Sequence, residues 1–136
     1  MFTEAELSYL ADQTLGRVAT QHPDGTLQVS PVAFTWNAET QTIDVSGYNL
    51  AKSRKYRNVE ANGHVAIVID DVPSTTPMRV RCLEIRGRGE AVPDAFASDG
   101  HLDGAVIRVY PRRIISFGID DPDHEPLETK TNNRNV

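Results

Sequence analysis

The sequence predicts a mainly β domain, a small antiparallel barrel of about six strands with two helices. Strand-like composition or alternation recurs along the chain, whereas only two segments have the apolar spacing of helices. The chain has neither a strand–helix–strand rhythm nor a glycine-rich phosphate loop. A barrel is the economical arrangement, because closure removes exposed strand edges.

The chain opens with a well-marked helix, expected over residues 4–13. Thr3 and Glu6 have the spacing of a capping box, and Phe2 and Leu7 have that of a hydrophobic staple. Apolar residues then continue along one face of the segment.

Three strands are expected next, over 17–20, 26–36 and 42–47, with turns between them. Pro31 lies inside the second of these segments. Proline has no N–H to donate to a ladder, so Pro31 indicates a strand edge or a bulge.

A second helix is expected over 51–62, with Gly63 placed to end it. Residues 65–69 are apolar at every position, which predicts a strand that is covered on both faces. The remaining elements are expected as a loop over 70–77, a strand over 80–92 and a final strand over 105–119 that is broken at Pro111.

The length of the chain suits one domain, which we place at 1–119. Beyond it, Leu127 and Val136 are almost the only apolar residues. This predicts a C-terminal tail over 120–136 that is mobile or packed on a dimer partner.

Composition narrows the class of protein. A net charge of −5 disfavours nucleic acid and anionic membranes as partners, so a bound anion requires a local cluster of cations. The single cysteine, Cys82, precludes an internal disulfide, and neither a signal peptide nor a long apolar run is present. We therefore expect a cytoplasmic protein. The histidines are scattered, so no metal site is expected.

Four cations, Lys52, Arg54, Lys55 and Arg57, surround Ser53 at the start of the second expected helix. Cations at a helix N-terminus cost a few tenths of a kcal/mol each, because that end is already electropositive. The cluster makes sense if an anion is held there by backbone N–H groups, the Ser53 hydroxyl and a cationic side chain. A solvated basic face is the alternative interpretation.

Several segments together carry a family resemblance that spans roughly residues 2–119. They are Phe2–Leu7, Leu15–Thr20, Pro23–Gly25, Ser30–Phe34, Asn49–Val59, Val68–Asp71, Glu84–Glu90 and Pro111–Gly118. In their order and spacing the chain resembles the pyridoxamine-5′-phosphate-oxidase-like split β-barrels. Within them it is similar to the class that uses the deazaflavin F420, close to the reductases of tetracycline biosynthesis.

The resemblance implies a six-stranded antiparallel split barrel of the FMN-binding type. It also implies a homodimer that holds the cofactor at the subunit interface. The cofactor phosphate would contact Ser53, Arg54, Lys55 and Arg57. The ring would lie along Ser30, Pro31 and Val32, with Ser46, Gly47 and Asn49 nearby. Asn58 would fix the helix, and the second subunit would supply Arg79 and Arg81.

The implied function is an F420-dependent oxidoreductase that transfers hydride to an activated double bond of a small organic substrate. Two alternatives stay open: an FMN-dependent oxidase or reductase of the same fold, and a flavin- or heme-binding protein without turnover. Arginines that include Arg86 and Arg88 favour the polyanionic F420, although Glu84 and Glu90 could neutralise those two. No catalytic residue is assigned.

Overall fold

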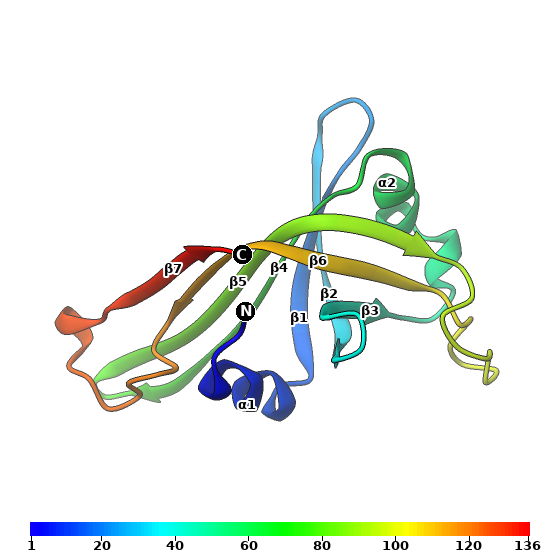
Figure 1. The fold of residues 1–136 in the computed structure, drawn as a ribbon. Helices are drawn as coiled ribbons and strands as arrows, with labels where there is room; N and C mark the ends of the chain where they lie inside the picture. Colours follow the sequence, from blue (N-terminus) through cyan, green and yellow to red (C-terminus); the bar gives the residue numbers. More distant parts are fainter.

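The computed structural model describes residues 1–136 and contains one seven-stranded antiparallel sheet (Figure 1). Its strand order is β3-β2-β1-β4-β5-β6-β7, and β3 also pairs with β6, which closes the barrel. The strands are β1 (Leu15–Gln21), β2 (Leu27–Asn37), β3 (Thr42–Ser46), β4 (His64–Thr75), β5 (Met78–Val92), β6 (Val106–Phe117) and β7 (Thr131–Asn135). The helices are α1 (Glu4–Asp12) and α2 (Arg54–Asn62), with 3-10 turns η1 (Leu50–Lys52) and η2 (Pro126–Glu128). The predicted fold class is confirmed, with one strand more than expected.

The barrel interior is filled by aliphatic side chains from alternate positions of the strands. Ile43, Ile67, Ile85 and Ile107, from four different strands, are almost completely buried there. The helices add Tyr9 and Leu10 of α1 and Tyr56 and Val59 of α2 to the same core. Neither helix is long and apolar enough to cross a membrane.

Helix α1 begins as the sequence predicts. The Thr3 hydroxyl accepts a hydrogen bond from the Glu6 N–H at 3.1 Å, and the Glu6 carboxylate accepts one from the Thr3 N–H at 2.9 Å. Phe2 packs edge-on against Trp36, with 5.2 Å between the ring centroids. The helix is thereby capped and joined to β2 at once.

The second helix is divided rather than continuous over 51–62. Ser53 adopts an extended backbone between η1 and α2, and its hydroxyl accepts from the Tyr56 N–H at 3.3 Å. The same hydroxyl donates to the Leu50 carbonyl at 2.6 Å. A serine that caps so well starts a new helix at Arg54. The helix ends at Gly63, as predicted, in a left-handed conformation with φ of 70°.

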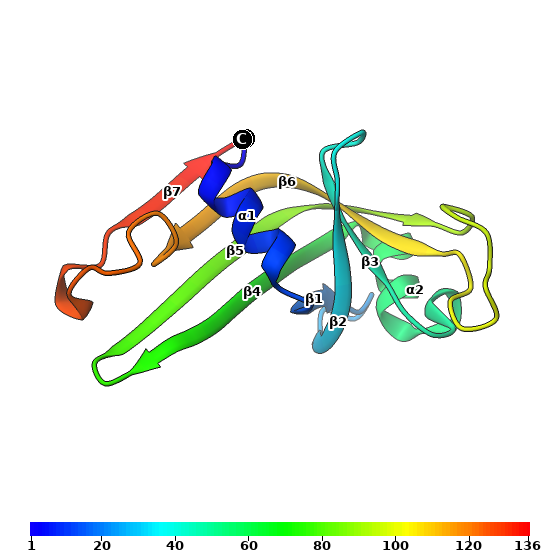
Figure 2. The same ribbon diagram turned by 90° about the horizontal axis from the view of Figure 1, so that it is seen from below.

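The apolar segment 65–69 is a strand, as predicted. The prediction that both its faces are covered is wrong for the single chain, which covers only one of them. Val65, Ile67 and Ile69 are buried in the barrel, whereas Ala66 and Val68 are only partly buried on its outer surface. No helix of this chain covers the outer surface of β1, β2 and β4 (Figures 1 and 2).

The expected loop over 70–77 is instead the end of a long hairpin that projects from the body (Figure 2). Pairing between β4 and β5 continues to Thr75 and Met78, with a register shift between Asp71 and Ser74. This irregularity accommodates Pro73, which cannot donate to the ladder. The turn-like composition of the segment concealed its extended backbone.

Strand β6 is likewise continuous, although a break at Pro111 was expected. Arg86 pairs with Arg113 and Gly87 with Pro111, so Arg112 is the extra residue of a bulge. A Cβ atom on Gly87 would lie 2.1 Å from the Tyr110 carbonyl oxygen, so only glycine fits opposite the proline.

The last residues are not a tail without secondary structure. Residues 131–135 form β7, which pairs with β6 of the same chain, so the sheet extends beyond the expected domain boundary at 119. Arg134 of this strand reaches the buried Glu6 carboxylate, with 2.5 Å between Nη2 and Oε1. The chain therefore holds its C-terminal strand both by backbone pairing and by a buried ion pair.

Candidate functional site

A cleft of about 410 Å³ lies between strand β2, the end of β3 and the start of α2. It brings together five of the predicted site residues from three separate segments of the chain. Its lining consists of Pro31, Val32, Ala33, Ser46, Gly47, Tyr48, Leu50, Lys55 and Leu102.

Strand β2 forms the apolar side of the cleft. It pairs with β3 only from Ala33 onward, so Pro31 lies at a free edge, as predicted. Ser30 faces the same side of β2 as Val32, and its hydroxyl is buried without a hydrogen-bond partner. A buried hydroxyl without a partner is costly, so Ser30 is a group that could serve a ligand beside this strand.

The end of β3 is held in place by a buried polar network. Asp44 accepts hydrogen bonds from Thr42 at 2.8 Å and from Asn37 at 3.0 Å. The Arg108 guanidinium donates to both oxygens of Asp44 at 3.2 Å, across the seam where β3 meets β6. This network fixes Ser46, which follows Asp44 by two residues and faces the cleft.

Lys55 supplies the positive charge of the cleft. The Lys55 and Arg54 N–H groups at the start of α2 donate to no acceptor, and none of Lys52, Arg54, Lys55 and Arg57 forms an ion pair. Lys55 and Arg57 are two residues apart and so point about 200° from each other around the helix. Only Lys55 lines the cleft, while the other three cations are exposed outside it.

Two of the predicted site residues, Ser53 and Asn58, are engaged in hydrogen bonds within the chain. The Ser53 hydroxyl is occupied as the N-cap of α2, with its proton directed to Leu50. Asn58 is fully buried, and its Nδ2 donates to the Thr20 hydroxyl at 3.1 Å. Asn58 thus fixes α2 against the barrel, as predicted, and has no exposed surface with which to contact a cofactor. Asn49 is exposed and adopts a left-handed turn beside the cleft.

Arg79 and Arg81 belong to the start of β5, in the hairpin with β4. The projecting end of this hairpin lies far from α2 of the same chain in both views (Figures 1 and 2). Arg79 donates to the His124 carbonyl at 3.2 Å. Arg81 pairs with Asp71, with 2.8 Å from its Nε to Oδ1, and hydrogen bonding to Arg81 holds the pKa of Asp71 below its usual value. That these arginines serve the cleft of a second subunit stays a prediction.

The other two arginines considered from the sequence are occupied on the outer sheet surface. Arg86 pairs with Glu84 at 2.6 Å, and the Arg88 guanidinium lies 4.3 Å from the centre of the Tyr110 ring. They contribute no free charge to the cleft.

Sequence reasoning missed four residues of the cleft lining, which are Ala33, Tyr48, Leu50 and Leu102. Tyr48 lies between the predicted Gly47 and Asn49, so its neighbours were a signal that could have included it. Leu102 comes from the loop over 93–105, whose composition has no periodicity to reveal which residue turns inward.

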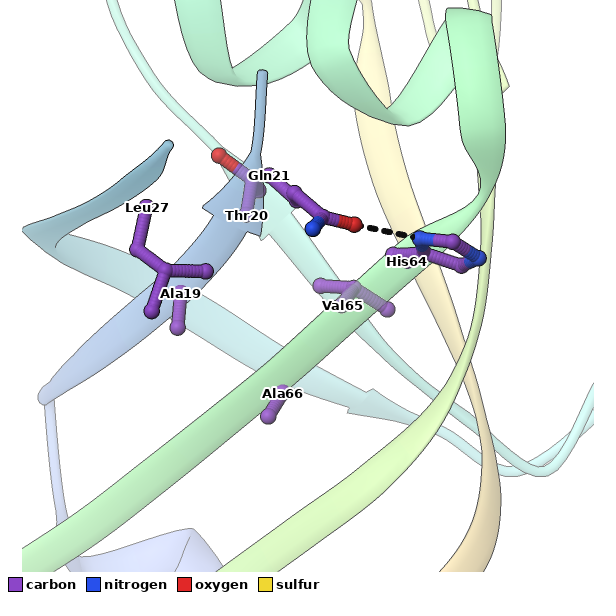
Figure 3. A pocket seen from close by; sticks show the side chains of 7 residues that line it. All are labelled: Ala19, Thr20, Gln21, Leu27, His64, Val65 and Ala66. Carbon is purple, nitrogen blue, oxygen red and sulfur yellow. Dashed lines mark hydrogen bonds between the residues drawn. The ribbon is translucent and has the colours of Figure 1, made fainter. Parts of the chain in front are cut away.

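A second, shallower pocket of about 270 Å³ lies on the outer surface of β1 and β4 (Figure 3). Its walls include Ala19, Leu27 and Ala66, and the Gln21 side chain is hydrogen-bonded to the His64 ring at 2.8 Å at one side. It contains no predicted site residue. It belongs to the apolar outer surface of the sheet.

The cleft combines a positive end with an apolar wall, which suits a flat molecule that carries an anionic group. The described chain holds no cluster of His, Cys, Asp and Glu side chains able to bind a metal ion. The split antiparallel barrel thus presents, beside one edge of its sheet, a cleft suited to a flat ligand with an anionic group.

Comparison with known proteins identifies the family. Residues 2–125 match the family model of pyridoxamine 5′-phosphate oxidase. Over 120 residues, 88% of this chain and 84% of the relative, the sequence is 40% identical to a 5a,11a-dehydrotetracycline/5a,11a-dehydrooxytetracycline reductase of Streptomyces rimosus. The chain therefore belongs to the pyridoxamine 5′-phosphate oxidase family, and it is an oxidoreductase of that family.

Solved structures agree with this assignment. A structure described as an F420 reductase is 29% identical, with a TM-score of 0.61 over 82% of this chain and 95% of that one. A conserved hypothetical protein of Mycobacterium tuberculosis shares the fold, with a TM-score of 0.67 at 19% identity over 85% of this chain and 84% of that one.

Proposed function

We propose that this protein is an F420-dependent reductase that delivers hydride to an activated carbon–carbon double bond, as in an enone or a quinone-like acceptor. The observation that carries the proposal is Lys55, an unpaired cation at the start of α2 that lines the cleft beside two free backbone N–H groups. The names of the 40%-identical relative and of the 29%-identical structure support a reductase and F420 respectively.

The residues of the cleft fit such a cofactor. Lys55 and the first N–H groups of α2 would hold its phosphate, because both place positive charge at the same point. Pro31 and Val32 would lie against its ring, and the Ser30 hydroxyl would find a partner there. Reduced F420, when bound, supplies the hydride. The chain contributes orientation, exclusion of water and hydrogen bonds to the developing oxyanion.

The proposal is tested by titrating the purified protein with F420 and with FMN, each followed by the fluorescence of the cofactor. We expect tight binding of F420 and weaker binding of FMN. Lys55→Ala removes one charge-assisted hydrogen bond, about 1.5–3 kcal/mol, and should weaken F420 binding roughly 10- to 100-fold. Lys52→Ala is the matched control, because Lys52 is an exposed cation of the same cluster that does not line the cleft.

Equal affinity of the Lys55→Ala and Lys52→Ala variants for F420 would show that the phosphate site lies elsewhere. Preference for FMN would favour the FMN-dependent alternative. Retention of either cofactor with no reduction of any acceptor would favour a binding protein without turnover.

We further propose that the protein is a homodimer formed through the outer surface of β1, β2 and β4. That surface exposes a contiguous apolar row that includes Leu27, 81% exposed, and Val29, 69% exposed. Ala66 and Val68 of β4 extend it, which explains why β4 is apolar at positions that this chain alone leaves uncovered. Monomeric proteins rarely leave such a surface open to water.

The apolar row is continuous with the cleft, because Pro31 and Ala33 belong to both. A second copy seated on the row would therefore border the cleft and shield it from solvent. A cytoplasmic location is proposed as well, because a chain with a single cysteine fits a reducing compartment.

Light scattering at micromolar concentration should give the mass of a dimer. Val29→Glu should convert it to a monomer, since a carboxylate in an apolar interface loses its hydration without a partner. Leu127→Glu is the control, because Leu127 is fully exposed but lies in the segment before β7, far along the chain from the row. A dimer that survives Val29→Glu would contradict this interface.

A further inference from the structure

Part of the cleft lining is aromatic and apolar. Tyr48 and Leu102 line it, and they come from the turn after β3 and from the loop over 93–105. Tyr48 is 75% exposed although it borders a cleft. The face of its ring is therefore open to a molecule that enters from solvent.

The loop over 93–105 is braced rather than loose. One Asp99 oxygen accepts hydrogen bonds from the His101 N–H at 2.9 Å and from the Leu102 N–H at 2.7 Å. The Ser98 hydroxyl donates to the Leu102 carbonyl at 3.1 Å. Such a turn fixes the direction of the two side chains that follow Asp99 and Gly100.

The same loop is tied to the segment that leads into α2. Asp103 accepts from the Ala51 N–H at 3.0 Å and from the Ala105 N–H at 3.2 Å. Gly104 has a φ of 84°, and a Cβ atom there would lie 2.3 Å from the Phe96 carbonyl oxygen, so the loop closes tightly on itself. The loop and the cationic end of the cleft therefore keep a fixed relation.

The loop also sets the orientation of Tyr48. The His101 ring meets the Tyr48 ring edge-on, with 6.2 Å between centroids and 68° between planes. His101 takes up only part of the tyrosine ring, since Tyr48 remains 75% exposed, and an accessible ring face is what a second flat ring stacks on.

We infer that Tyr48 is the specificity-determining residue for the electron acceptor and that it selects flat, aromatic acceptors over small non-aromatic ones. The inference rests on the proposed function, in which the cationic end of the cleft is taken by the cofactor. Leu102 provides the apolar contact beside Tyr48, and the braced loop keeps both in position before the acceptor arrives.

The test measures binding, so it does not depend on turnover. Equilibrium dialysis of 2-methyl-1,4-naphthoquinone and of cyclohex-2-en-1-one against the full chain, with and without F420, gives the affinity for a flat aromatic and for a small non-aromatic acceptor. Tyr48→Leu should weaken binding of the naphthoquinone roughly three- to tenfold, the effect of one stacked ring pair. It should leave cyclohexenone binding unchanged.

Tyr48→Phe keeps the ring and should bind the naphthoquinone as the parent does. Tyr110→Leu is the matched control, because Tyr110 lies against Arg88 on the outer sheet surface and away from the cleft. Neither change should alter the preference between the two acceptors.

The inference is overturned if the parent chain binds no naphthoquinone, or if Tyr48→Leu weakens both acceptors equally. Those results leave the proposed function standing as long as F420 binds through Lys55. Conversely, the protein could bind the naphthoquinone through Tyr48 but take up no F420. That result would refute the proposed function and leave the role of Tyr48 intact.

Discussion

The ion pair between Arg134 and Glu6 yields a sharp prediction about stability. The Glu6 carboxylate is fully buried, and Arg134 donates to both its oxygens, with 2.5 Å from Nη2 to Oε1 and 3.2 Å from Nη1 to Oε2. Arg134→Met keeps much of the side-chain volume and removes the charge. Glu6 would then be a buried carboxylate without an opposing charge, left with the Thr3 N–H and the nearby Ser116 hydroxyl.

Removing one partner of a buried pair costs about 3–5 kcal/mol. We take the lower end, about 3 kcal/mol, because Arg134 itself retains 23% side-chain exposure and water can partly replace it. With an unfolding entropy of about 2.1 cal/mol/K per residue, this lowers the melting temperature of a chain of this length by roughly 10 °C.

The pH dependence identifies the cause. Burial alone would raise the pKa of Glu6, but hydrogen bonds from Arg134 and from the Thr3 N–H outweigh it and hold the pKa below the ordinary 4.5. A lowered pKa contributes stability above about pH 4.5 that is lost as the pH falls through the folded-state pKa. In the Arg134→Met variant, the hydrogen bonds that counteract the burial of Glu6 are fewer, so the pKa of Glu6 rises. The ionised Glu6 carboxylate then destabilises the fold at neutral pH. The deficit of the variant should therefore shrink from pH 7 to pH 4.

Urea unfolding followed by the fluorescence of Trp36, the single tryptophan, measures the free energy of unfolding, with parent and variant at equal concentration. Arg113→Met is the control, since Arg113 also joins β6 to β7, through Asn135 at 2.8 Å, but by a hydrogen bond that is exposed to solvent. It should cost less than about 0.5 kcal/mol. A deficit in Arg134→Met that is below 1 kcal/mol, or that is the same at pH 4 and pH 7, would refute the reasoning.

Two further changes probe the elements on which the cleft depends. Arg108→Met leaves the buried Asp44 without its cation and should cost about 3 kcal/mol in urea unfolding, with weakened F420 binding because the end of β3 loses its support; unchanged stability would show that Thr42 and Asn37 suffice. Thr3→Ala removes the N-cap of α1 and should cost about 1 kcal/mol in the same assay without affecting F420 affinity, so a loss of affinity there would contradict a purely local role.

The elements that the sequence predicted well are those whose signals are local. The capping box of Thr3 and Glu6 and the end of α2 at Gly63 depend on residues within one turn of each other, so spacing alone identifies them. Lys55, which lines the cleft, was singled out in the same way, because a cation at a helix start is locally unfavourable. Features of this kind can be predicted from the sequence because the residues that cause them are close together in the chain.

What the sequence concealed depends on partners distant along the chain. Residues 131–135 contain no apolar side chain. They nevertheless form β7, because their backbone pairs with the edge strand β6 and Arg134 binds the Glu6 carboxylate. The sequence near Pro73 predicts a loop, whereas the structure has a bulged hairpin end there. A bulge is defined only by the pairing of two strands, which the local sequence does not show. Leu102 enters the cleft by the same kind of distant arrangement, through the bond of Asp103 to Ala51.

The seam between β3 and β6 has a consequence for how the protein matures. Ile43 meets Val109 there, so the two strands are separated by about half the chain, and contacts between such distant segments form late in folding. Ser46 and Gly47 lie at the end of this seam, so the cleft comes into existence only after most of the chain has been synthesised and the barrel has shut. A ligand that binds only the shut barrel would favour it by mass action, and cofactor supply would then govern how much mature protein accumulates in a cell.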